Sequence, residues 1–89
     1  MMDRKEVYEV IDGERDYQDS LGPDRTRDPG NVHRLVQGED LVLIRHYLRK
    51  AEDAWTMSGG EMVPAALHEV RKIAAICVRQ MEKYGAPKR

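Results

Sequence analysis

At 89 residues the chain is short enough for a single domain over 1–89, and a monomer of this size buries only about two-thirds of its unfolded surface. We therefore expect a marginal core and self-association into a homo-oligomer. The net charge of −1 lacks the strong basic excess of dedicated nucleic-acid binders, so no nucleic-acid polymer is expected as a partner. The sequence has no Phe and many good helix formers, which favours an all-α protein.

The chain carries no sign of a membrane or export segment. No run approaches the ~20 apolar residues that cross a bilayer, and the charged beginning is not followed by the apolar stretch of a signal peptide. We expect a cytoplasmic protein without a membrane partner. Cys77, the one cysteine, falls in an apolar pattern and is interpreted as a small core residue.

The first helix is predicted over about 3–20. Asp3 suits its N-cap, and Glu6 three residues later resembles a capping box. Gly13 costs about 1 kcal/mol relative to Ala inside a helix, so either the helix bends there or another chain or ligand approaches closely.

Two polar residues fall on the side of this helix that should be apolar. The helical period places Glu14 and Gln18 on the stripe that Val7, Val10 and Ile11 begin. Burying them costs several kcal/mol, roughly, unless something pairs with them. They are interpreted either as inward ligands for a metal, a base or a ribose, or as a polar pair satisfied by Arg or Tyr from another helix or subunit.

A loop is predicted over 21–35, because Gly and Pro recur there among charged residues. Long irregular connections in small domains are often functional. Arg25 and Arg27 lie in this loop and are candidate phosphate ligands.

The second helix is predicted over about 36–57. Its apolar stripe advances in alternating steps of three and four through Leu41, Ile44, Leu48, Ala51 and Trp55. Arg45 and Arg49 project from one side of this helix, one turn apart, with His46 beside them. Guanidinium groups bind phosphate through paired, charge-assisted hydrogen bonds, although these arginines are equally interpreted as a solvated face paired with Glu52 and Asp53.

The third helix is predicted over about 62–84, after the break at 58–60. Pro64 suits its first turn and Gly85 its end. Its inward side is expected to carry Leu67, Val70, Ile73, Ala74, Cys77, Met81 and Tyr84. The short connection predicts a long antiparallel hairpin with the first helix packed across it, completed by oligomerisation.

The sequence resembles small phage and prophage MazG-like proteins, a family of all-α nucleoside triphosphate pyrophosphohydrolases and their relatives. Three segments carry the resemblance: Val10-Ile11-Asp12-Gly13-Glu14-Arg15-Asp16-Tyr17-Gln18-Asp19, Leu67-His68-Glu69-Val70-Arg71-Lys72-Ile73-Ala74-Ala75-Ile76-Cys77-Val78, and Gly85-Ala86-Pro87. The resemblance implies carboxylates of EExxE and ExxD type that hold Mg²⁺. Here Ile44-Arg45-His46-Tyr47-Leu48-Arg49 stands where the first cluster should begin, so cations replace the metal ligands.

The main hypothesis is therefore a non-catalytic, oligomeric protein that binds a small phosphorylated nucleotide. A phage protein that sequesters a nucleotide signal of host defence is one concrete version. This hypothesis assigns no catalytic residue, metal or cofactor, and its ligand-binding residues are Glu14, Gln18, Arg45, Arg49, Arg15, His46, Arg25 and Arg27.

Two alternatives stay open. The first is a Mg²⁺-dependent pyrophosphohydrolase of MazG-like type, with an irregular metal site built from Glu14, Asp16, Glu52, Asp53 and Glu69. The second is a helical protein-interaction module. Its signature would be an exposed apolar strip, with Glu14 and Gln18 salt-bridged and no pocket between the helices.

Overall fold

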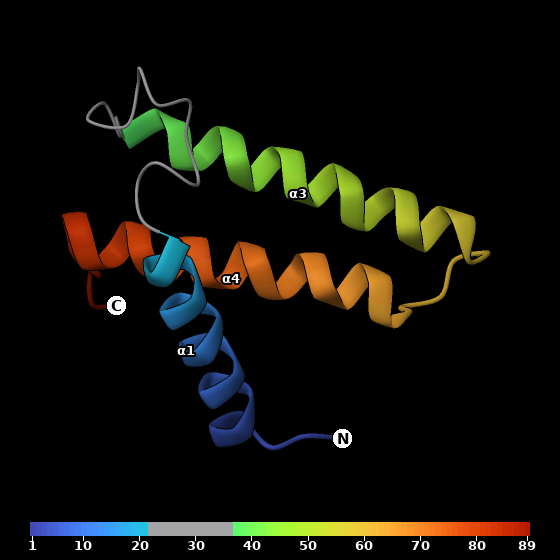
Figure 1. The fold of residues 1–89 in the computed structure, drawn as a ribbon, viewed down its shortest axis with the longest axis horizontal. Coiled ribbons are helices and arrows are strands. Elements are labelled where there is room, and N and C mark those ends of the chain that lie inside the picture. The colour runs from blue at the N-terminus through green and yellow to red at the C-terminus, as the bar shows by residue number, and fades with distance from the viewer. Residues whose placement is uncertain (22–36) are drawn as a thin grey trace.

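The computed structural model describes residues 1–21 and 37–89, and over this part of the chain the protein is all-helical (Figure 1). The helices are α1 (Arg4–Leu21), α3 (Gln37–Met57) and α4 (Pro64–Tyr84). The predicted all-α class is confirmed. The predicted loop, with Arg25 and Arg27, falls almost entirely outside the described residues.

Helices α3 and α4 form the predicted antiparallel hairpin and share the largest contact in the structure. Asp40 pairs with Arg79 at 2.7 Å, and Lys50 lies 3.8 Å from Glu69. A step of ten residues forward along α3 thus matches a step of ten back along α4, which fixes the register. Lys72 also lies over the ring of Tyr47, 5.1 Å from its centroid.

Local sequence signals explain where the elements begin and end. Asp3 accepts a hydrogen bond from the Glu6 backbone N–H at 2.9 Å, as an N-cap should. The hairpin turns at Gly59 and Gly60, whose φ values of +80° and +92° suit only glycine comfortably. Pro64 occupies the first turn of α4, and the N–H of Gly85 closes its last turn on the Met81 carbonyl.

Helix α1 packs on α4 alone. Among the described residues it contacts α4 but not α3, and Figure 1 shows it crossing α4 steeply, with the N-terminus pointing away from the hairpin. The expectation that this helix packs across the hairpin is met on α4, while α3 takes no part in the contact within the described residues. One helix of the hairpin thus supplies the described surface that holds α1.

The core is thin. The buried apolar residues among those described are Ala51, Ala66, Ala75 and Ile76, and no large side chain is fully buried. Several residues expected to face inward are instead exposed: Val7, Val10, Leu67, Val70, Met81 and Tyr84. The reason is geometric, because a two-helix hairpin covers only one side of each helix and α1 covers only one further patch of α4.

Within the described residues, none of the helices is long and apolar enough to cross a membrane.

Candidate functional site

Glu14 has the partner that its position requires. Its carboxylate is only 10% exposed and accepts a hydrogen bond from Arg71 Nε at 3.0 Å. Arg71 also contacts the ring nitrogen Nδ1 of His68. The carboxylate is thus neutralised by an arginine from another helix of the same chain, which is one of the two interpretations left open by the sequence.

Arg15 is the one buried residue of α1, at 8% exposure. It donates from Nε to Glu82 at 2.6 Å and from Nη1 to Asp19 at 2.9 Å. The hydrogen bond to Glu82 raises the pKa of the guanidinium, with Asp19 adding to it against the opposing effect of burial. The helical period does not place Arg15 on the apolar stripe of α1, and it is nevertheless buried because α4 crosses α1 at this point.

The two ion pairs diverge along α4. Glu14 forms an ion pair with Arg71, and the next residue of α1, Arg15, forms one with Glu82. Two successive residues of α1 therefore bind α4 on either side of the point where the helices cross. These bonds fix the position of α1 on α4. They also engage two of the predicted ligand-binding residues in the fold itself.

Gln18 is half-buried and differs from its neighbours. Its Oε1 is buried and has no hydrogen-bond partner among the described residues, as is also true of Gln80 Oε1 and Arg79 Nε. An unsatisfied buried amide costs about 1–3 kcal/mol. Among the predicted site residues on α1, Gln18 is therefore the one whose side-chain oxygen accepts no hydrogen bond within the described chain.

Arg45, His46 and Arg49 are all exposed on α3. The structure gives neither arginine an ion pair with a described residue, and the expected partners Glu52 and Asp53 do not engage them. His46 stacks edge-on against the ring of Tyr47, at 5.2 Å between centroids. The two guanidinium groups are thus available to a ligand.

The two halves of the predicted site do not meet within one chain. Glu14 and Arg15 bond to Arg71 and Glu82 of α4, whereas α3 contacts the side of α4 that carries Glu69 and Arg79. At about 100° per residue these two sides of α4 are roughly 110° apart. Since α1 also makes no contact with α3 among the described residues, the fold does not bring Glu14 and Gln18 against Arg45 and Arg49 there.

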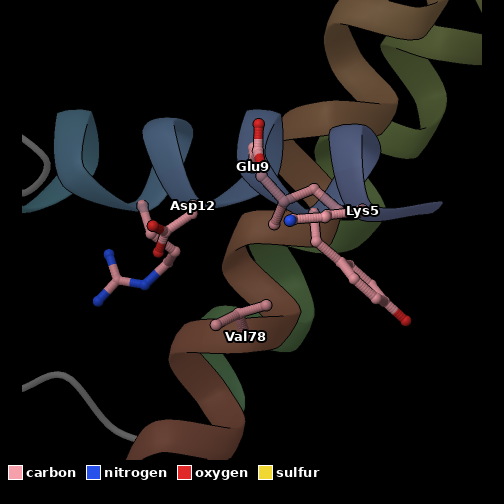
Figure 2. Close-up of a pocket in the computed structure, with 7 residues that line it drawn as sticks. Lys5, Glu9, Asp12 and Val78 are labelled. Atoms are coloured by element: carbon pink, nitrogen blue, oxygen red, sulfur yellow. The ribbon is translucent and has the colours of Figure 1, made fainter. Parts of the chain in front are cut away.

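A depression of about 420 Å³ lies between α1 and α4. Figure 2 shows Lys5, Glu9 and Asp12 on α1, with Val78 of α4 across from them. Arg15 is the predicted ligand-binding residue in its lining, and its guanidinium is already bonded to Glu82 and Asp19. With one lysine against two carboxylates, this lining does not favour an anionic ligand.

The carboxylates of the enzyme alternative are scattered. Glu14 is held by Arg71, while the buried Glu69 lies 3.3 Å from Lys72 and 3.8 Å from Lys50. In residues 1–21 and 37–89 no group of three or more His, Cys, Asp or Glu side chains is arranged to hold a metal ion.

Two features were missed by sequence reasoning. One is the pairing of α1 with Arg71 and Glu82, which no local pattern signals because these partners are more than fifty residues away. The other is an apolar surface along one side of the hairpin, consisting of Leu41, Leu48, Trp55, Leu67, Val70 and Met81, which we call the hairpin face. Its residues were recognised as apolar stripes but assigned to the interior.

Comparison of the chain with protein-family models, curated proteins and solved structures gives no match. The resemblance to MazG-like proteins stays a prediction. The arrangement of the described side chains is therefore the basis for a functional proposal.

Proposed function

We propose that this protein is a non-catalytic, oligomeric helical protein that binds a small phosphorylated nucleotide through Arg45 and Arg49. The observation that carries the proposal is the exposed, unpaired state of this arginine pair within the described chain. In its fullest form, drawn from the MazG-like resemblance, the protein is of phage origin and sequesters a nucleotide signal in the cytoplasm of a bacterial host.

The arginines that hold the helices together differ from Arg45 and Arg49 in their bonding. Arg15, Arg71 and Arg79 each bond to a carboxylate on another helix. Arg45 and Arg49 have no such role, and two like charges four residues apart destabilise a helix by about 0.2–0.5 kcal/mol. A phosphate placed between them would remove this repulsion and accept the paired hydrogen bonds that guanidinium groups offer.

The remainder of the nucleotide would be recognised by Gln18. Its Oε1 lacks a partner within the described chain and can accept a hydrogen bond from a base or ribose once the side chain turns outward, because the atom is buried as it stands. Glu14 is a weaker candidate for this role, since a ligand would have to displace Arg71. Because α1, which carries Gln18, does not contact α3 among the described residues, the full site would form between two copies.

The proposal is tested by isothermal titration against cyclic dinucleotides, cyclic ADP-ribose species and nucleoside triphosphates. We expect at least one of them to bind with a Kd well below about 1 mM. The double variant Arg45→Gln/Arg49→Gln should bind that ligand at least about tenfold more weakly, because it loses the charge-assisted hydrogen bonds.

A matched control separates phosphate recognition from net charge. Arg4 and Arg89 are exposed and lie outside the candidate site, so Arg4→Gln/Arg89→Gln removes the same charge and should leave the affinity unchanged. Absence of binding tighter than millimolar across the panel would overturn the proposal. Release of pyrophosphate that requires Mg²⁺ and is lost in Glu14→Gln would favour the enzyme alternative.

The exposed hairpin face favours a second candidate, a helical protein-interaction module. Leu41 is 60% exposed and Leu67 51%, which is unusual for apolar residues spaced in steps of three and four. Glu14 is also salt-bridged, as this alternative anticipates. Gln18 does not fit it, because its amide oxygen lacks a partner among the described residues.

A further inference from the structure

We propose that the hairpin face binds the same face of a second copy of this chain. The inference deepens the proposed function and rests on it in one respect, since it names the partner that would complete the ligand site. The evidence is the position, exposure, chemistry and area of the face.

The face is continuous across both helices. On α4 the residues that meet α3 include Glu69 and Ile76, and Val70 and Cys77 each lie one position further along. On α3, Leu41 likewise follows the buried Asp40, and Leu48 and Trp55 repeat its position every seven residues. In an antiparallel helix pair, the residue that follows a contact residue by one position lies on the same side of the hairpin in both helices.

Nothing among the described residues covers this side. Helix α1 occupies the flank of α4 that carries Arg71 and Glu82, beyond the far edge of the face. The six side chains of the face are between 40% and 60% exposed. Large apolar residues at this spacing normally pack against another helix.

The chemistry of the face matches a second copy. Its six members are uncharged, while the exposed Arg45 and Glu52 alternate with Leu41, Leu48 and Trp55 along α3, so its partner has to be apolar with charged residues of both signs at the edge, as a second copy is. The members on α4 belong to a series at 67, 70, 74, 77 and 81, which advances in steps of three and four as helix bundles require. Ala74 and Cys77, at the middle of this series, are small enough to let a facing helix approach closely.

The area also reaches what a specific dimer needs. With large side chains taken at about 200 Å² each and about half exposed, two faces would bury on the order of 1,200 Å² in total. Specific interfaces begin at about 1,000–1,200 Å². Two hairpins joined in this way form a four-helix bundle with a core that one chain lacks.

This pairing places the arginines next to the second chain. Arg45 and Arg49 follow Ile44 and Leu48 by one position, so they lie along the outer edge of the face. When α3 packs against α4 of the second copy, this edge faces the chain that carries a second α1 on the neighbouring flank of that α4. A nucleotide held by the arginines would then have the second chain within reach, and this is how the two halves of the predicted site would be completed.

The test is sedimentation equilibrium of the full chain without any nucleotide, over protein concentrations from about 1 to about 100 µM. The wild-type protein should have the mass of a dimer or a multiple of it. Leu48→Glu places a charge in the middle of the face and should weaken association at least about tenfold. Val42→Glu makes an equivalent change at a residue of α3 that is 61% exposed and lies off the face, and it should associate like the wild type.

A second measurement does not depend on any variant folding. Cys77 lies within the face and is the one thiol of the chain, so its alkylation rate reports whether the face is covered. The rate should fall as the wild-type concentration rises. Circular dichroism checks that Leu48→Glu retains its helices. If the variant has lost them, the concentration dependence of Cys77 alkylation in the wild type tests the inference instead.

Two outcomes would overturn the inference. One is a wild-type monomer at the highest concentration with an alkylation rate independent of concentration, which would mean that a second copy does not cover the face. The other is a Leu48→Glu variant that is folded and associates like the wild type. A chain that dimerises yet binds no nucleotide would overturn only the proposed function, whereas a monomer that binds one would overturn this inference and the oligomeric part of the proposed function, and would leave nucleotide binding itself standing.

Discussion

At the scale of single residues, the ion pair between Glu14 and Arg71 is asymmetric. The carboxylate is 10% exposed, whereas the Arg71 side chain keeps 35% of its exposure. Removing the arginine would therefore leave a buried charge without its partner, and removing the carboxylate would leave a cation that water can reach. We expect Arg71→Met to lower the free energy of unfolding by about 2–3 kcal/mol and Glu14→Gln by about 1 kcal/mol or less.

Urea unfolding of the two variants, followed by circular dichroism, measures this difference. Lys5→Met is a suitable control, because Lys5 is exposed and should change the free energy of unfolding by less than about 0.5 kcal/mol. Equal losses in Arg71→Met and Glu14→Gln would contradict the asymmetry and mean that the pair contributes only as an exposed salt bridge.

The sequence predicts some of these residues and not others for a physical reason. The helical period is local, so it correctly places Glu14 on the side of α1 that is buried. The identity of its partner depends on how α1 crosses α4, and 57 residues separate Glu14 from Arg71. The burial of Arg15 was not predictable for the same reason, because a steep crossing covers positions beside the apolar stripe as well as those on it.

At the scale of the helix, Gly13 is the most informative position in α1. The helix continues through it from Arg4 to Leu21, and a Cβ built there meets nothing within 4 Å. The helix is not interrupted at the glycine, and no close neighbour within the described chain accounts for it. Gly13→Ala should therefore raise the free energy of unfolding by about 0.5–1 kcal/mol, since alanine has less conformational entropy to lose.

Gly60→Ala provides the contrast. Gly60 has a φ of +92°, and its Cβ would lie 3.5 Å from the Trp55 ring, so this variant should lose about 1 kcal/mol or more. Thermal unfolding of both variants decides the matter. If Gly13→Ala instead lost stability and self-association together, a second chain would have to lie against α1 at that point.

The ends of the helices were predictable because their signals are local. The Asp3 cap, Pro64 in the first turn of α4 and Gly85 at its end each act within a few residues. Which side of each helix is covered was not predictable in this way. The stripe through Val70 and Met81 has the same period whether its partner is α3, α1 or a second copy.

At the scale of the whole molecule, the thin core predicts that stability depends on concentration. One chain buries Ala51, Ala66, Ala75 and Ile76 in the described part, and this is little apolar surface for a folded domain. If folding is coupled to dimerisation, each tenfold rise in protein concentration adds about 1.4 kcal/mol to the apparent stability of the dimer.

Urea unfolding at protein concentrations about a hundredfold apart measures this effect. The midpoint should shift upward for the wild type and for Val42→Glu, and it should stay constant for Leu48→Glu, which has lost its partner. A wild-type midpoint that does not move would show that the single chain is stable without a second copy.

The oligomer and the nucleotide site are also coupled. If Arg45 and Arg49 bind phosphate while Gln18 of a second copy binds the base or ribose, a monomer offers only half of the contacts. Val70→Glu places its charge in the face on α4 and adds no carboxylate beside the arginines on α3, so it should lose at least about tenfold in affinity for any nucleotide that the wild type binds. Titration of this variant beside the wild type measures the loss, and equal affinities in the two would mean that each chain binds its ligand independently.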